Sequence, residues 1–176
     1  MILGYFGGMN SSHNVLVIRT ARRDDVAGIM QVRREAILAK AASHHDPVTL
    51  NDWADAGDAE RMAKRISDSD YRALVAEANG GLIGFAMAAI SKHELQALYV
   101  KPNQIGKVGT ALLAAIEALA FQAVPFLVCD ASLNAESFYK AHGYIEECRK
   151  DQVSSSGEMI SRVVQMRKVR PNAGPG

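Results

Sequence analysis

The chain has 176 residues, enough for one domain with a substantial core and few for two. Hydrophobic residues make up 48% and charged residues 22%, and a net charge of +1 leaves no electrostatic footprint for nucleic acid. No apolar run reaches membrane-spanning length, and two cysteines are too few for a disulfide framework. We therefore expect a cytoplasmic protein without nucleic-acid or membrane partners.

The two ends of the chain carry no periodic pattern, and we expect residues 1–14 and 170–176 to be flexible. The opening MILGYFGGMN is apolar but lacks the basic start and the cleavage-like site of a signal peptide. Residues 15–169 are expected to form a single domain.

In chain order, the β-branched run at 15–21 predicts a strand, and the helical spacing of apolar residues over 22–42 predicts a helix. Two shorter helices are predicted at 50–56 and 58–66. The apolar runs on either side of Ala78-Asn79-Gly80-Gly81 predict a β-hairpin, because both positions of an Asn-Gly turn tolerate positive φ.

A third strand is predicted at 93–100, ended by Pro102, and a helix at 108–122. After it come a strand at 125–131, a short helix at 134–142, and strands at 144–150 and 157–169. This order predicts an α/β fold: one domain whose mixed, mostly antiparallel sheet of about six to seven strands is flanked by helices.

The segment QIGKVG places Gly106 and Gly109 on either side of Lys107, between a strand and a helix. Free N–H groups at the positive end of a helix dipole suit an anion, pyrophosphate above all. A helix start without a ligand explains the same residues equally well. The better-known phosphate motifs, GxxxxGK[ST] and GxGxxG after the first strand, are absent from the sequence.

The strand LQALYVKP, the turn QIGKVG and the helix TALLAAIEALA resemble the acetyl-CoA-binding core of the GNAT N-acyltransferase superfamily. Downstream, SLNAESFYKAHGYIE resembles the second signature of that family. The resemblance covers about residues 15–169 and implies transfer of an acetyl group from acetyl-CoA to an amine of a small molecule or a protein. Compared with the family pattern, the turn lacks either one residue or one of its glycines. This difference affects the expected affinity for the cofactor.

The resemblance implies that the end of the third hairpin strand, the glycine turn and the second signature bind the coenzyme. Its residues there are Leu98, Tyr99, Val100, Ile105, Gly106, Lys107, Val108, Gly109, Thr110, Asn134 and Phe138. A main-chain N–H within 98–100 would hold the developing oxyanion. For Asn134, the alternative is a role as N-cap of the short helix.

Tyr139 matches the general-acid tyrosine of the family, and a phenol with a reference pKa of about 10 is protonated at neutral pH. The alternative is a packing residue: because Phe138 and Tyr139 are adjacent, one should pack and the other should face the cleft.

Glu94 is the candidate general base, with an exposed strand-end glutamate as the alternative. Alternation along the strand predicts that Glu94 shares a face with Gln96, Leu98 and Val100, opposite His93, Leu95, Ala97 and Tyr99. His93 is the competing base, because the pKa of histidine lies near working pH.

Three consecutive residues, His44, His45 and Asp46, do not converge easily on one ion, so we expect no metal site. In the resemblance their segment walls the acceptor pocket, and His45 and Trp53 are predicted to contact the acceptor; Trp53 as a core residue explains it equally well. Cys129 is expected to be a small buried residue rather than a nucleophile.

Two wider alternatives stay open at this point. The irregular glycine turn also fits a non-catalytic acyl-CoA-binding or regulatory domain. A homodimer through the C-terminal strands is common among relatives, and the sequence does not decide between it and a monomer.

Overall fold

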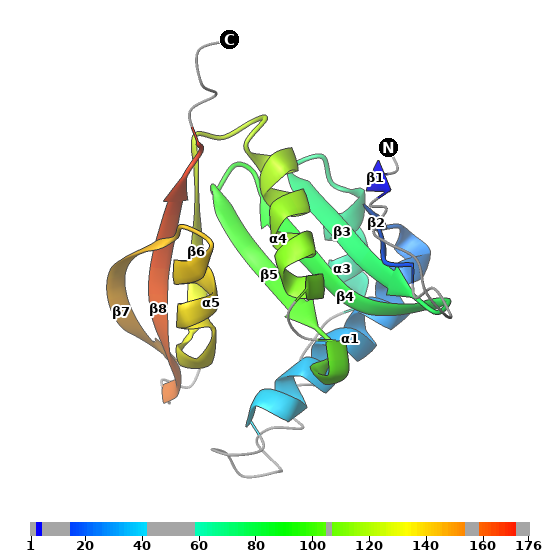
Figure 1. The fold of residues 1–176 in the computed structure, drawn as a ribbon, viewed down its shortest axis with the longest axis horizontal. Coiled ribbons are helices and arrows are strands. Elements are labelled where there is room, and N and C mark those ends of the chain that lie inside the picture. The colour runs from blue at the N-terminus through cyan, green and yellow to red at the C-terminus, as the bar shows by residue number, and fades with distance from the viewer. Residues whose placement is uncertain (1–2, 5–14, 42–58, 105–106, 154–158, 172–176) are drawn as a thin grey trace.

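The computed structural model describes residues 3–4, 15–41, 59–104, 107–153 and 159–171. Its strands form one sheet in the order β1-β2-β3-β4-β5-β6-β8-β7 (Figure 1). Neighbouring strands are antiparallel except β5 and β6, which are parallel. The predicted α/β fold with a mixed, mostly antiparallel sheet is confirmed.

The strands are β1 (Leu3–Gly4), β2 (Val17–Thr20), β3 (Tyr71–Ala78), β4 (Gly81–Ala89), β5 (Glu94–Val100), β6 (Phe126–Ser132), β7 (Ile145–Val153) and β8 (Met159–Val169). The helices are α1 (Val26–Ala41), α3 (Ala59–Ser67), α4 (Lys107–Ala120) and α5 (Glu136–Ala141), with 3-10 turns η1 (Arg23–Asp25), η2 (Pro102–Gln104) and η3 (Leu133–Ala135). All seven predicted strands are present. The helix predicted at 50–56 lies outside the described residues.

Strand β1 lies within the segment predicted to be flexible, and it pairs with β2. The limits of the domain at 15 and 169 stay a prediction.

The β3–β4 hairpin forms at the predicted Asn-Gly turn. Ala78 pairs with Gly81, and the two loop residues between them both have positive φ, 52° at Asn79 and 74° at Gly80. This geometry matches the right-handed twist of the two strands, so the turn sets their register.

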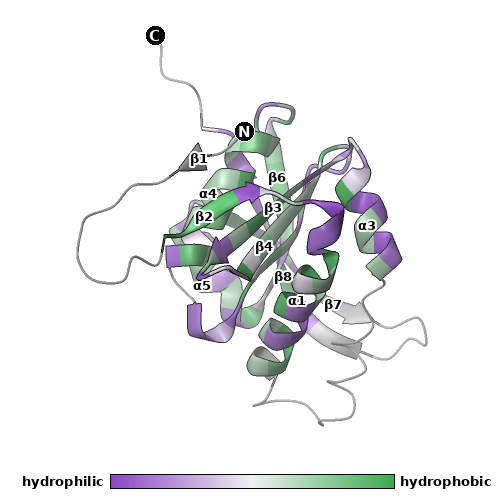
Figure 2. Cartoon of the chain, turned by 90° about the vertical axis from the view of Figure 1, so that its right-hand side faces the viewer, coloured by the Kyte–Doolittle hydropathy of each residue, from purple (hydrophilic) through white to green (hydrophobic). Residues whose placement is uncertain are grey.

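The sheet separates two apolar layers, with α4 and α5 on one side and α1 and α3 on the other (Figure 2). On the α4 side the helix comes very close to β4 at Gly84. A Cβ atom there would lie 2.8 Å from Leu112 Cδ1 and 3.1 Å from the main-chain oxygen of Tyr99. Glycine at this position therefore lets α4 pack directly on the sheet.

Candidate active site

Strands β5 and β6 are paired where β5 begins and separate toward its end (Figure 1). Glu94 pairs with Val128, whose N–H donates to the His93 carbonyl at 2.8 Å. At the far end of β5, Lys101 N donates to Ile83 O of β4 at 2.8 Å. Because alternate residues of a strand direct their main-chain groups to opposite neighbours, those of residues 98 and 100 face the opening toward β6.

Helix α4 begins at Lys107, just beyond the end of β5, and its first turn offers N–H groups that have no partner within the helix. Lys107 is exposed, whereas Val108 and Gly109 are buried. A Cβ on Gly109 would lie 3.7 Å from ring atoms of Phe138, an ordinary contact. Packing alone therefore does not require glycine here, in contrast to Gly84.

His142 joins α5 to the first turn of α4. Its Nδ1 lies 2.7 Å from the Phe138 carbonyl, which can only accept, so Nδ1 carries a proton. The other ring nitrogen, Nε2, lies 3.1 Å from Thr110 Oγ1. The imidazole thus holds two predicted coenzyme-binding residues, Thr110 and Phe138, against each other; sequence reasoning missed it, because its partner Thr110 lies on a different helix.

Tyr139 is buried, with 8% of its surface exposed, and its ring contacts those of Phe138 and Tyr144 at centroid distances of 5.3 and 5.2 Å. Burial raises the pKa of its hydroxyl, and Cys129 of β6 and Tyr99 of β5 raise it further. Its raised pKa keeps the hydroxyl protonated at neutral pH. Tyr139 shares one apolar core with Leu98 and Val100 of β5 and Cys129 of β6, so it lies near both diverging strands. Phe138 is half-buried against the same core. Both aromatic side chains therefore pack, which differs from the prediction that only one of them would.

Ser132 and Asn134 lie where β6 ends. Ser132 Oγ is buried and has no hydrogen-bond partner among the described residues, so it can bind a group that the protein itself does not supply. Asn134 is exposed within η3, and the N-cap of α5 is Ala135. The alternative that Asn134 caps the short helix is therefore wrong.

A β-bulge corrects the predicted faces of β5. The register passes from Met87–Ala97 to Ala88–Leu95, which leaves Gln96 as an extra residue. Leu95 consequently packs in the same α4-side core as Leu98 and Val100, whereas Ala97 and Tyr99 pack on the α1 side.

The prediction that Glu94 shares a face with Leu98 and Val100 is therefore wrong, because that alternation assumes an unbroken strand. Glu94 lies on the α1 side, where Gln96 Nε2 donates to its Oε2 at 2.8 Å. The two faces of β5 thus carry different groups: the candidate base is on one, and the layer that contains Tyr139 is on the other.

His93, the competing base, occupies a turn with a φ of 52°. Its ring packs in an edge-to-face arrangement with that of Phe126, with 4.6 Å between the two ring centroids. Its Nδ1 is buried without a hydrogen-bond partner among the described residues. His93 and Glu94 both lie where β5 and β6 are still paired, before they separate. The choice between them as the base stays a prediction.

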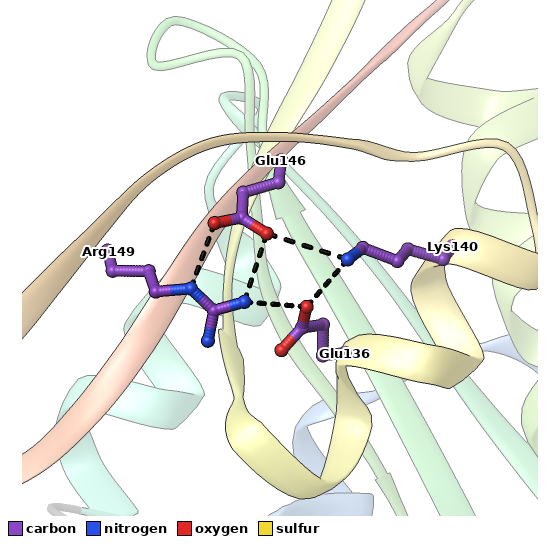
Figure 3. Close-up of polar contacts among 4 residues, drawn as sticks. All are labelled: Glu136, Lys140, Glu146 and Arg149. Carbon is purple, nitrogen blue, oxygen red and sulfur yellow. Dashed lines mark hydrogen bonds and ion pairs between the residues drawn. The ribbon is translucent and has the colours of Figure 1, made fainter.

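Two sets of ion pairs hold the elements around the opening. One set is a surface network in which each of two carboxylates, Glu136 of α5 and Glu146 of β7, pairs with both Lys140 and Arg149 (Figure 3). Glu136 Oε1 lies 2.7 Å from Lys140 Nζ and 2.8 Å from Arg149 Nη2. Beneath α4, Glu117 and Lys168 form a largely buried pair at 2.6 Å. The first set joins α5 to β7, and the second joins α4 to β8.

Cys129 is buried, with 3% of its surface exposed, which confirms the prediction of a small core residue. Burial raises the pKa of its thiol to about 12, so the reactive thiolate is not formed at neutral pH. Cys148, by contrast, is exposed.

Four predicted site residues, His45, Trp53, Ile105 and Gly106, lie outside the described residues. Within the described part of the chain, no three His, Cys, Asp or Glu side chains are grouped as ligands for a metal ion. None of the described helices is long and apolar enough to cross a bilayer. The predicted roles of the site residues stay predictions.

Comparison with known proteins identifies the family. A family model described as an acetyltransferase (GNAT) domain matches residues 41–169. The fold is similar to that of a GCN5-related N-acetyltransferase from Rhodopseudomonas palustris, with a TM-score of 0.75 and 29% identity over 93% of this chain and 100% of that one. No curated protein matches the sequence.

Two further solved structures share the fold. The PaiA N-acetyltransferase from Thermoplasma acidophilum, in complex with coenzyme A, has a TM-score of 0.72 and 23% identity over 88% of this chain and 99% of that one. YncA from Salmonella typhimurium, with its cofactor acetyl-CoA, has a TM-score of 0.66 and 21% identity over 92% and 98%. With the family model covering most of its length, the chain belongs to the GNAT acetyltransferases and is an acyltransferase.

Proposed function

We propose that this protein transfers the acetyl group of acetyl-CoA to a primary amine, of a small molecule or of a protein, by direct attack within a ternary complex. The observation that carries the proposal is the separation of β5 from β6 beside the start of α4, with Tyr139 in the same core as residues of both strands. Membership of an acetyltransferase family favours an enzyme over a non-catalytic acyl-CoA-binding domain.

Acetyl-CoA is the cosubstrate: when bound, it supplies the acetyl group as a thioester. The main-chain groups of Leu98 and Val100 would bind its amide-containing arm as a strand edge binds a peptide, and Ser132 Oγ would supply a further hydrogen bond from β6. The first turn of α4, with Lys107 exposed beside it, would hold the diphosphate. Gly109 leaves that turn open to close approach.

Each chemical task falls to a residue of this chain. A main-chain N–H of 98–100 stabilises the negative charge that develops on the thioester oxygen. Glu94, directly or through water, accepts the proton that the amine loses as its nitrogen bonds to the acetyl carbon. Tyr139 donates a proton to sulfur as the carbon–sulfur bond breaks, so the products are the amide and a free thiol.

The test is release of free coenzyme A thiol across a panel of primary amines, including peptides with lysine and free N-terminal amines. Thiol release above the rate without enzyme supports the proposal and also narrows the acceptor class. Tight coenzyme A binding in calorimetry with no release across the panel would show a binding domain instead.

The anion site has its own test in Lys107→Glu, an exposed change at the start of α4. A carboxylate there suits the helix dipole, so the fold is retained, but it repels a diphosphate. We expect affinity for coenzyme A to fall by about tenfold and the loss to shrink as salt is raised. Unchanged affinity would exclude this turn as the phosphate site.

We further propose that residues 15–169 form the catalytic domain, in the cytoplasm. His45 and Trp53 are proposed to contact the acceptor, and a homodimer through the C-terminal strands stays a prediction that sedimentation of the purified protein checks.

A further inference from the structure

Only one of the two polar atoms of the Gln96 side chain has a hydrogen-bond partner among the described residues. Its Nε2 donates to Glu94 at 2.8 Å, while its Oε1 is buried and has no hydrogen-bond partner among the described residues. A buried oxygen without a donor costs free energy, and such groups in native structures call for an explanation.

The orientation of this amide follows from its partner. A carboxylate only accepts, so it is the nitrogen of Gln96 that donates to Glu94, and the amide oxygen is left for another donor. Gln96 is the extra residue of the bulge, and its hydrogen bond to Glu94 keeps its side chain on the α1 side of β5, opposite the layer that contains Tyr139. The unsatisfied oxygen is therefore next to the candidate base, on the same face of the sheet.

We propose that Gln96 is an acceptor-binding residue that makes the site select a primary amine. Its Oε1 accepts one N–H of the amine while Glu94 receives the other proton. This inference rests on the proposed acetyl transfer. A neutral primary amine has two N–H groups and one lone pair, so engaging both N–H groups leaves the lone pair free to attack the acetyl carbon. A secondary amine has one N–H and must leave one of the two oxygens without a partner.

Hydroxylamine and N-methylhydroxylamine are suitable probes, because both are small, both are uncharged at neutral pH, and they carry two and one N–H groups. With acetyl-CoA, each gives a hydroxamic acid that forms a coloured ferric complex. A neutral hydrogen bond corresponds to a factor of about five to ten in rate. We expect the ratio of the rate with hydroxylamine to the rate with N-methylhydroxylamine to be larger by this factor with the wild-type protein than in the uncatalysed reactions.

Gln96→Leu and Gln96→Met remove the amide at similar volume, and we expect the preference to fall to the uncatalysed ratio with the KM for acetyl-CoA unchanged. A purely steric preference against the methyl group would survive in both variants. Gln165→Leu is the matched control, because Gln165 is also half-buried and lies on β8 away from Glu94. It should keep the wild-type preference.

The outcomes separate the two proposals. Acetylation of neither probe by the wild-type protein would count against the proposed transfer itself. If the wild-type protein acetylates both probes in the same ratio of rates as the uncatalysed reactions, the role of Gln96 alone would be overturned. This measurement uses only the wild-type protein and so does not depend on a variant that folds. A preference that persists in Gln96→Leu would overturn it as well.

Discussion

The molecule has two regions that meet at the opening between β5 and β6. In the first, β2 to β5 are covered on both faces by α1, α3 and α4, and most of the largest fully buried side chains lie here, such as Phe85, Met87 and Leu112. The second region consists of β6, β8, β7 and α5. It exposes large apolar side chains such as Ile145 and Val169, and its elements are joined by ion pairs on the surface.

This difference matters because the candidate site draws on both regions. Glu94 and Gln96 belong to the densely packed region, whereas Tyr139 belongs to the more polar one. The regions are joined by the pairing of Glu94 with Val128, by the core beneath α4, and by the ion pair of Glu117 with Lys168. In the proposed mechanism, catalysis therefore depends on how firmly the second region is held against the first.

The largest expected effect is that of Tyr139→Phe, which removes the hydroxyl proposed as the proton donor and keeps the ring. We expect the acetyl-transfer kcat to fall by about 10²- to 10⁴-fold, the usual contribution of general acid catalysis. Affinity for coenzyme A and thermal stability should stay at wild-type values, since the ring still packs against Tyr144. Wild-type turnover in steady-state assays with hydroxylamine would show that another group protonates the thiol.

Next comes Lys168→Met, which tests the link between the regions. It leaves the Glu117 carboxylate largely buried and without its cation, and breaking such a pair costs about 3–5 kcal/mol of unfolding free energy. Chemical denaturation measures the loss.

The double variant Lys168→Met with Glu117→Leu provides the control. It removes both charges, so it should recover most of the stability that the single variant loses. A single variant as stable as wild type would mean that the pair does not hold α4 to β8.

Sequence reasoning predicted the features that depend on neighbours in the chain. The turn at Asn79-Gly80 is local and was predicted correctly. Tyr139 was found by a short motif, and its role stays a prediction. The face of Glu94 was predicted wrongly, because a bulge arises from the pairing of β5 with β4 and leaves no mark in the alternation of residues. The bond of His142 to Thr110 and that of Lys168 to Glu117 join residues 32 and 51 positions apart, and no local pattern shows them.

A smaller effect is expected at alkaline pH, from the buried thiol of the second region. Burial raises the pKa of Cys129 from its usual 9.0 to about 12, so between these values the folded chain binds more protons than the unfolded one. The free energy of unfolding should therefore fall as pH rises above 9, by up to about 1.4 kcal/mol per pH unit for this group.

Cys129→Ala provides the comparison for that slope. Between pH 9 and 10 its unfolding free energy should decline less steeply than that of the wild type, whereas above pH 10 the raised pKa values of Tyr139 and Tyr144 act in both proteins. Parallel slopes below pH 10 would mean that the thiol ionises as easily in the folded chain as in the unfolded one.

The smallest effect is expected for Glu136→Gln, which removes the carboxylate shared by Lys140 and Arg149 on the surface of the second region. Exposed ion pairs gain little because water screens them, and Glu146 stays bound to both cations. Denaturation at low and high salt should therefore give curves near those of wild type, with any difference shrinking as salt is added. A loss as large as that of Lys168→Met, or a fall in kcat with stability intact, would show that the surface network is what holds α5, and with it Tyr139, in place.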